Sequence, residues 1–243
     1  MIIAQVSDIH ANPSGGEIAR FSRAVDWLCQ TKPDLVVLSG DLVDEGWNEG
    51  YRLIGTIAAK LPCEVVCMPG NADDKRQVAL LSAGNGWQKH GAGFNIAKTV
   101  GEALIVCLDT CVDTHAHGDL TPHLAWLRST LDGDLEGTPL IFTHHHLFPC
   151  GIDRLDDAIC LGIDRLKLLM RETARRPLAF CSGHVHQTMT SCVEGIQAYI
   201  CGSICHANPL LWSEVQNTPS IDPPMLMMYR LQDQNLVSAA IAV

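Results

Sequence analysis

Seven residues whose side chains commonly bind metals stand at the ends of apolar runs. They are Asp8, His10, Asp41, Asn71, His144, His184 and His186. The last two follow the run 177–181, and Gly183 lets the backbone bend so that both imidazoles can converge on one point. A His-x-His pair alone is as often two surface histidines. The repetition of the pattern along the chain is what indicates a site.

Three of these residues also have a plainer interpretation when they are taken singly. Asp8 could cap a helix, Asp41 could be a turn residue after Gly40, and Asn71 could occupy a left-handed turn after Gly70. Each alternative is reasonable by itself. All of them holding together, each beyond a separate apolar run, is much less probable than one shared site.

The donor set indicates the chemistry. Two aspartates, one asparagine and four histidines suit Mn, Fe or Zn better than Ca, which prefers all-oxygen ligands. Seven ligands are too many for one tetrahedral zinc. They fit two divalent or trivalent metal ions about 3.5–4 Å apart that share a carboxylate, hold a bridging hydroxide and clamp a phosphoryl group.

The elements that must position these residues alternate between strand and helix in the first half. Strands are expected at 2–7, 34–39 and 63–68, and helices at 17–30, 47–60 and 74–82. This order is typical of an α/β fold, in which ligands bind beyond the carboxyl ends of the strands. Asp8, His10, Asp41 and Asn71 all fall at such ends.

The second half continues the pattern with more antiparallel character. The expected elements are strands at 103–108, 140–143 and 178–182, helices at 120–131 and 159–175, a polar loop at 150–158, and hairpin strands at 187–193, 196–201, 225–231 and 235–242. The apolar run 225–228 is interpreted as a core strand, with the edge of a homodimer as the alternative. No linker or repeat divides the chain, so one domain over 1–243 is expected.

Composition narrows the class of protein. The 243 residues are 47% hydrophobic and carry a net charge of −10, which argues against nucleic acid as a partner. Eleven cysteines in mostly apolar runs, without the spacing of a zinc ribbon, indicate structural thiols and a reducing cytoplasm. Residues 1–6 already form a strand, so no signal peptide is expected, and no apolar run reaches the ~18 residues of a membrane span.

The ordered motifs resemble the calcineurin-like metallophosphoesterase superfamily. They are Asp8-x-His10, Gly40-Asp41, Gly70-Asn71, the cluster 144–146 and Gly183-His184-x-His186. The runs 144–149 and 183–187 are most similar to the class III cyclic-nucleotide phosphodiesterase branch, which includes glycerophosphodiesterases. The resemblance implies a four-layer α/β/β/α sandwich with two mixed β-sheets.

The resemblance also implies roles for the residues that match the motifs. Asp8, His10 and His186 correspond to ligands of the first metal; Asn71, His144 and His184 correspond to ligands of the second; Asp41 corresponds to the bridge. His144 is chosen from its cluster because the family ligand directly ends its strand. His145 and His146 would then face the substrate or support the ligands.

The chain departs from the family at one position. The usual Gly-Asn-His-Asp/Glu is here Gly70-Asn71-Ala72-Asp73, and the side chain of Ala72 has no proton to give. Another histidine takes over this role, or the substrate has a good leaving group, or activity is reduced. We expect the first, with Asn71 and His145 as catalytic residues and His206 as a substrate-binding residue.

The function that follows is a metal-dependent phosphodiesterase acting on a small anionic phosphoester. Its substrate would be a cyclic nucleotide such as cyclic AMP, or a glycerophosphodiester. The alternatives are a phosphomonoesterase or nucleotide pyrophosphatase, and a non-catalytic metal-binding scaffold. A scaffold is expected to lose ligands, whereas every ligand position is filled here.

Overall fold

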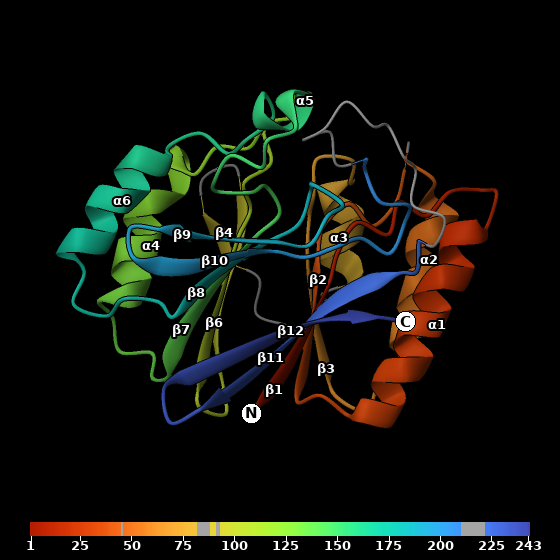
Figure 1. Cartoon of the computed structure of the whole chain (residues 1–243), viewed down its shortest axis with the longest axis horizontal. Helices are drawn as coiled ribbons and strands as arrows, with labels where there is room; N and C mark the ends of the chain where they lie inside the picture. The colour runs from red at the N-terminus through yellow and green to blue at the C-terminus, as the bar shows by residue number, and fades with distance from the viewer. Residues whose placement is uncertain (45, 82–87, 91–92, 210–221) are drawn as a thin grey trace.

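The computed structural model describes residues 1–44, 46–81, 88–90, 93–209 and 222–243. Within this part of the chain the strands form two mixed sheets (Figure 1). The first sheet has the order β12 (Asn235–Ala242), β11 (Met225–Gln232), β1 (Ile2–Val6), β2 (Leu35–Ser39) and β3 (Glu64–Met68). The second has the order β4 (Gln88–His90), β5 (Gly93–Val100), β6 (Ala103–Leu108), β7 (Thr138–Thr143), β8 (Ala179–Ser182), β10 (Ile196–Ile200) and β9 (Met189–Val193).

Helices cover the outer face of each sheet. The first sheet is covered by α1 (Gly16–Thr31), α2 (Asn48–Ala58) and α3 (Lys75–Leu81). The second is covered by α4 (Leu124–Leu131), which follows the 3₁₀ turn Thr121–His123, and by α6 (Ile163–Glu172). Figure 1 shows α1 and α2 on one side of the molecule and α4 and α6 on the other. The four-layer α/β/β/α sandwich with two mixed sheets is therefore confirmed.

Alternate side chains of the central strands point to opposite faces of the sheet, so one short strand packs against both the helices and the other sheet. Val36 and Leu38 of β2 face the helices, whereas Leu35 and Val37 face the other sheet. The side-chain period of a strand is two residues, so a strand with both faces buried must be apolar at nearly every position. This explains the continuous apolar runs in the sequence.

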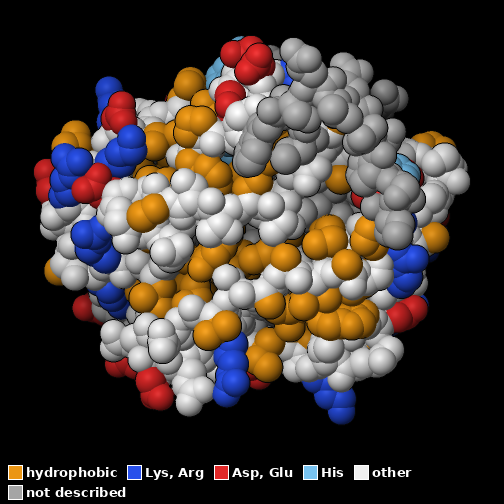
Figure 2. All heavy atoms as spheres, in the orientation of Figure 1, with side chains coloured by type: hydrophobic (Ala, Val, Ile, Leu, Met, Phe, Trp, Pro, Cys, Tyr) orange, Lys and Arg blue, Asp and Glu red, His pale blue; other side chains and the backbone are white. Residues whose placement is uncertain are grey.

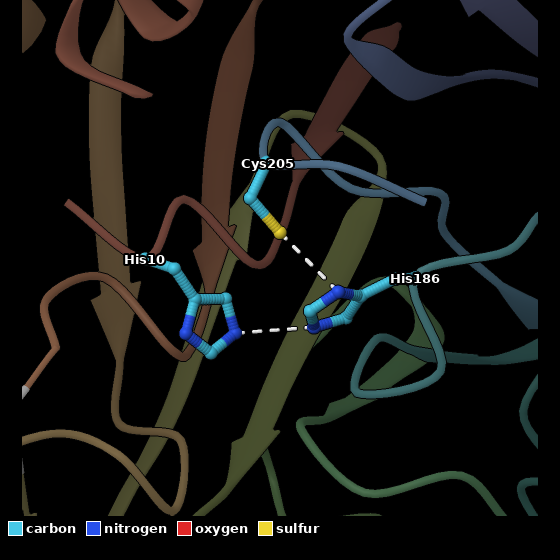
Figure 3. Close-up of side chains that lie close together, drawn as sticks. All are labelled: His10, His186 and Cys205. Atoms are coloured by element: carbon cyan, nitrogen blue, oxygen red, sulfur yellow. Dashed lines mark hydrogen bonds between the residues drawn. The ribbon is translucent and has the colours of Figure 1, made fainter. Parts of the chain in front are cut away.

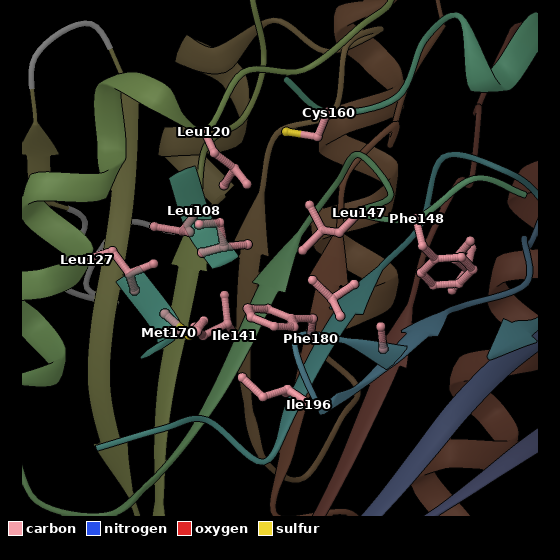
Figure 4. Close-up of a cluster of buried hydrophobic side chains, with 14 of the residues drawn as sticks. Leu108, Leu120, Leu127, Ile141, Leu147, Phe148, Cys160, Met170, Phe180 and Ile196 are labelled. Carbon is pink, nitrogen blue, oxygen red and sulfur yellow. The ribbon is translucent and has the colours of Figure 1, made fainter. Parts of the chain in front are cut away.

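The outer core of the second sheet contains many large side chains. Phe180 and Ile141 of the sheet pack with Leu127 of α4 and Met170 of α6, as Figure 4 shows. Burying one such side chain fully stabilises the fold by about 1.5–3 kcal/mol. On the face in Figure 2, apolar side chains lie across the middle and charged side chains of both signs are scattered around the edge.

One polar residue links the two sheets inside the molecule. Gln5 of β1 is fully buried. Its Nε2 donates hydrogen bonds to Ser39 Oγ at 2.9 Å and to the Ser182 carbonyl, in the second sheet, at 3.0 Å. Its Oε1 accepts one from the Tyr229 hydroxyl at 2.7 Å. All of these polar groups are paired, so the link holds the sheets in register without a large desolvation penalty.

The strand after residue 225 is confirmed as core. Leu226 of β11 packs among the helices of the first sheet and Met227 packs between the two sheets, both buried. No disulfide joins any of the eleven cysteines, all of which lie in the described ranges. Among the described helices, none combines the length and the apolar character that crossing a bilayer requires.

Some sequence expectations were wrong in detail. The polar loop expected at 150–158 contains the short helix α5 (Asp153–Asp156) and buries Cys150, Ile152 and Leu155 in the outer core. Helix α6 begins at Ile163 and not at residue 159, because Leu161 is extended and exchanges backbone hydrogen bonds with Gly118 and Leu120. Strand β5 was not expected at all.

Candidate metal centre

The seven residues with metal-binding side chains all follow the carboxyl ends of strands. Asp8 and His10 follow β1, Asp41 follows β2 and Asn71 follows β3, all in the first sheet. His144 follows β7, and His184 and His186 follow β8, in the second sheet. Strands β1–β3 are parallel, as are β7 and β8, so each sheet gathers its ligands at one edge. The two edges meet.

Asp41 lies between two histidines. Its Oδ2 is 3.4 Å from Nε2 of His10 and 3.4 Å from Nε2 of His144. Its Oδ1 accepts a hydrogen bond from the Ala72 backbone N–H at 2.8 Å, which fixes the orientation of the carboxylate. A single carboxylate oxygen equidistant from two imidazoles on different sheets has the position of a bridging ligand.

One group of ligand atoms gathers on the His10 side of Asp41. Nε2 of His10 lies 3.1 Å from Nε2 of His186, and a dashed line joins these two nitrogens in Figure 3. Nε2 of His186 is 3.3 Å from Oδ1 of Asp8. Two nitrogens and two carboxylate oxygens thus surround one small volume.

A second group gathers on the His144 side. Nε2 of His144 lies 3.3 Å from Nδ1 of His184. Asn71 stands in the turn beside Asp41, and its Oδ1 is buried without a hydrogen-bond partner in the described part of the chain. A buried amide oxygen seldom goes unpaired. This orphaned oxygen fits a role as a metal ligand.

Outward hydrogen bonds fix the ring nitrogens of three histidines. In each ring Nδ1 is bonded away from the centre, so Nε2 points inward. The Nδ1 distances are 2.6 Å from His10 to Asp44, 3.0 Å from His144 to the Ser39 carbonyl, and 3.2 and 3.3 Å from His186 to the Cys205 thiol and the His206 carbonyl. Carbonyl oxygens and the ionised Asp44 carboxylate can only accept, so these Nδ1 atoms carry the proton and leave the Nε2 lone pair for a cation.

The backbone is strained at most of these positions. Five of the seven residues have a positive φ, in the left-handed region: Asp8 at 54°, His10 at 49°, Asp41 at 50°, His184 at 71° and His186 at 58°. Each such conformation costs on the order of 1–3 kcal/mol for a residue with a Cβ. Strain of this kind concentrates at functional sites, where it aims side chains that a regular strand end would point elsewhere.

The charges of the site are strongly coupled. Burial by itself would raise the pKa of Asp8, but the charge of His186 and its hydrogen bond outweigh burial and hold the pKa at about 2. Burial would lower the pKa of His144, but Asp41 raises it to about 9. Burial, and then the charge of His144, lower the pKa of His184 to about 3, although Asp41 and Asp8 act in the opposite direction. The carboxylates therefore stay ionised beside the histidines.

His145, expected to be catalytic, is fully buried with both ring nitrogens occupied. Nε2 is 3.1 Å from the Ala116 carbonyl, which can only accept, so Nε2 carries the proton. Nδ1 then accepts from the Thr110 hydroxyl at 2.8 Å. Burial also lowers the pKa of this ring well below its usual value. In this geometry His145 is neutral, and its one N–H is donated to the Ala116 carbonyl.

His206, expected to bind substrate, is the most exposed of the histidines considered. Its side chain is 74% exposed, and its Nδ1 lies 2.5 Å from Asp222 Oδ2. Its backbone carbonyl faces the ring of His186. The loop that carries His206 is fixed by Arg20, whose guanidinium donates to the carbonyls of Ile204 and Cys205.

Sequence reasoning missed three residues that support the ligands. Asp44 and Cys205 hold the rings of His10 and His186. Asp73 is partly buried and accepts hydrogen bonds from the backbone of Leu42 at 3.0 Å and of Gly70 at 2.9 Å, which joins the loops after β2 and β3. Burial, and then the charge of Asp41, raises the pKa of Asp73 to about 6. Asp44 and Asp73 lie only three and two residues beyond ligands, and that proximity was the available signal.

Comparison with known sequences finds phosphodiesterases among the similar proteins. A probable glycerophosphodiester phosphodiesterase GpdQ from Arcobacter nitrofigilis is 27% identical over an alignment 252 positions long, which covers 98% of this chain and 92% of that protein. The 3',5'-cyclic adenosine monophosphate phosphodiesterase CpdA of Escherichia coli K12 is 32% identical over 162 residues, covering 64% of this chain and 55% of that protein.

Solved structures share the fold at much lower identity. A dimetal phosphatase from Danio rerio superposes with a TM-score of 0.74 at 14% identity, covering 100% of this chain and 96% of that one. The purple acid phosphatase PPD1 from yellow lupin gives 0.71 at 12% identity, covering 100% of this chain and 51% of that one. The sequence profile of the calcineurin-like phosphoesterases matches residues 1–188, and the chain therefore belongs to the calcineurin-like phosphoesterase family.

Proposed function

We propose that this protein is a metal-dependent phosphodiesterase that hydrolyses small phosphodiesters, with glycerophosphodiesters as the first substrate class. The observation that carries the proposal is the position of Asp41 Oδ2, 3.4 Å from Nε2 of both His10 and His144. That arrangement suits two cations that share one carboxylate, and a pair of cations is a common device for phosphoryl transfer.

The residues present fit two such ions of Mn, Fe or Zn. Asp8, His10 and His186 with Asp41 would hold one ion; Asn71, His144 and His184 with Asp41 would hold the other. When bound, the ions supply Lewis acidity that polarises a phosphoryl group and lowers the pKa of water. The mixed oxygen and imidazole donors suit these metals better than Ca or Mg.

Three further assignments concern how the side chains near the metal site would act on the substrate. Asn71 lies in the turn beside Asp41; with its buried amide oxygen on the second ion, its NH₂ group remains a donor, which we assign to a phosphoryl oxygen of the substrate. His145 is locked by Thr110 and Ala116, so we assign it to support of the neighbouring rings His144 and His184. His206 is exposed at the edge of the site and remains the proposed substrate-binding residue.

We rank the two substrate classes by how much of this chain aligns with a relative of each class. The alignment with the probable glycerophosphodiesterase spans 98% of this chain, whereas the alignment with the cyclic AMP phosphodiesterase spans 64%. Cyclic nucleotides are kept as the second class. The cyclic AMP phosphodiesterase has the higher identity, 32%, but over the shorter part of this chain. Both classes are diesters with one negative charge on the phosphate.

The test measures hydrolysis of glycerophosphocholine, cyclic AMP, bis(p-nitrophenyl) phosphate and p-nitrophenyl phosphate by Mn-reconstituted protein. Asn71→Ala is the site variant, and Asn235→Ala, at the exposed first residue of β12, is the matched control. Turnover of the diesters that Asn71→Ala loses and Asn235→Ala keeps would support the proposal. Faster turnover of the monoester would indicate a phosphomonoesterase, and bound metal without turnover would indicate a scaffold.

A further inference from the structure

A second cluster of metal-binding side chains lies in the loop that follows His144. His146, Cys150 and Asp156 each offer one ligand atom, and these atoms all lie within 4.8 Å of one another. His146 is fully buried, Cys150 is 3% exposed and the Asp156 side chain is 27% exposed. None of these residues belongs to the centre around Asp41.

His146 is the unusual member of this cluster. Neither of its ring nitrogens has a hydrogen-bond partner in the described part of the chain. Its Nε2 lies 3.7 Å from Asp156 Oδ1, which is too long for a hydrogen bond. Leaving a buried polar group unpaired costs about 1–3 kcal/mol. Such a group in a native protein calls for an explanation, and a bound ion is one of the few available.

We propose that His146, Cys150 and Asp156 bind one zinc ion, separate from the two ions of the Asp41 centre. The ligand types match zinc, which takes Cys, His and Asp at roughly 2.0–2.3 Å in a tetrahedron. Such bond lengths place neighbouring ligand atoms roughly 3.3–3.8 Å apart, and the His146–Asp156 separation of 3.7 Å fits. The partial exposure of Asp156 leaves the fourth position open to water.

The surroundings orient the ligands for this role. The Asp156 carboxylate accepts hydrogen bonds from the backbone N–H of Cys150 at 2.7 Å and of Gly151 at 2.9 Å. These bonds fix the carboxylate and leave each oxygen a further lone pair. Leu147 and Phe148 from the same loop pack into the outer core, as Figure 4 shows, so the loop is anchored on its other side.

Binding is a simple exchange of a proton for a metal. The Cys150 S–H bond breaks, a sulfur–zinc bond forms, and the proton leaves to solvent, with no change in oxidation state. His146 stacks on His184, with ring centroids 5.6 Å apart and planes at 17°. By fixing the ring of His146, the ion would therefore also restrict the orientation of the His184 ring that stacks on it. The site does not depend on the proposed phosphodiesterase activity.

Cobalt substitution tests the proposal on the full-length protein. After metal removal, Co²⁺ is added and the near-ultraviolet absorption of a cobalt–thiolate bond is followed, together with metal content by mass spectrometry. We expect the band in the wild type, its loss in Cys150→Ser, and the loss of one equivalent of metal in that variant. Asp156→Asn, at a partly exposed position, should lose the same equivalent with little effect on folding.

Two controls separate this site from its neighbours. Cys205 lies against His186, so Cys205→Ser must keep the band if the thiolate is Cys150. Cys160→Ser, a buried cysteine of the same core cluster, should also keep it. Asp41→Ala should lose metal from the Asp41 centre and retain the band. Absence of the band in the wild type, or its persistence in folded Cys150→Ser, would overturn the proposal and leave buried water as the partner of His146.

Discussion

The thiol of Cys205 lies 3.2 Å from Nδ1 of His186, the ring nitrogen that does not face His10 (Figure 3). The His206 carbonyl is 3.3 Å from the same nitrogen. Because the carbonyl can only accept, Nδ1 carries the proton and the sulfur accepts as well. A proposed ligand is thus oriented by a sulfur atom where carboxylates and carbonyls are the usual partners.

Removal of this sulfur should weaken metal binding at the His10–His186 end. Cys205→Ala leaves Nδ1 with one weak acceptor, and we expect a loss of about 10–100-fold in affinity for one of the two ions. Cys205→Ser, whose hydroxyl can accept, should restore most of it. Calorimetric titration with Mn²⁺ measures both, with the exposed Cys192→Ala as control. Equal affinity in the alanine and serine variants would refute this role.

Asp41→Ala should affect both ions at once. Its Oδ2 faces His10 and His144 equally, so neither group of ligands is complete without it. We expect metal content at the centre and diester turnover to fall together, whereas Asn71→Ala should lose only one ion. Metal analysis after gel filtration distinguishes the two patterns. Two retained ions in Asp41→Ala would contradict a bridging role.

The stability of the metal-free protein should fall as pH rises. The pKa values of His10 and His144 are raised to about 9, with burial opposing and Asp44 or Asp41 dominating the net shift, against about 6.5 in an unfolded chain. The folded state therefore binds more protons across this window, and the stabilisation present below pH about 6.5 is lost as pH approaches about 9. Urea unfolding in chelator at several pH values measures this.

Saturating Mn²⁺ should remove or reverse that dependence. The cations displace the protons from the same nitrogens, so rising pH no longer costs the folded state its bound protons. His10→Asn should also flatten the metal-free profile. If stability in chelator did not change between about pH 6.5 and 9, the raised pKa values would be wrong.

Gly70→Ala should disrupt the centre although no ligand is changed. A Cβ at Gly70 would lie 2.2 Å from Asp41 Oδ1 and 2.3 Å from the Asp41 backbone nitrogen, so the loop after β2 or β3 must shift. We expect lower metal affinity and a loss of about 1–3 kcal/mol of stability. Gly16→Ala in α1, where no atom lies within 4 Å of the added Cβ, is the matched control. Equal behaviour of the two variants would count against the close approach.

Ala72→His should raise turnover of diesters with poor leaving groups. The Ala72 N–H donates to Asp41, so an imidazole at this position would start beside the centre, whereas His145 is held by Thr110 and Ala116. General acid catalysis contributes typically about 10²–10⁴-fold when geometry is good, and we expect the lower end. The readout is the ratio of kcat/KM for an alkyl and an aryl diester. An unchanged ratio would show that no acid is missing.

The layers of the fold could be predicted because strands that are buried on both faces leave continuous apolar runs in the sequence. Runs such as 34–39 are apolar at nearly every position, as strands buried on both faces must be. Strand β5 was missed because Asn95, Lys98 and Thr99 interrupt its apolar pattern, although tertiary contacts with β6 hold it in place. The short helix α5 was missed because three of its four residues are polar and one apolar residue, Leu155, shows no helical period.

The ligand positions could be predicted from strand ends, but their support could not. The left-handed backbone at Asp8, His10 and Asp41 depends on contacts between distant loops, and no local pattern predicts it for these residues. The same holds for His145, whose neutral tautomer is set by Thr110 and the Ala116 carbonyl. Long-range hydrogen bonds therefore decided which histidines face the centre.

The division of ligands between the two sheets has a consequence beyond catalysis. Asp8, His10, Asp41 and Asn71 belong to one half of the sandwich, and His144, His184 and His186 to the other, so bound cations would cross-link the halves as rivets do. An ion at 100 times its dissociation constant adds about 2.7 kcal/mol to the stability of the folded state. Metal starvation would then shorten the lifetime of the polypeptide as well as abolish its activity. Without the ions the two halves of the sandwich would separate more often and be cleaved by proteases.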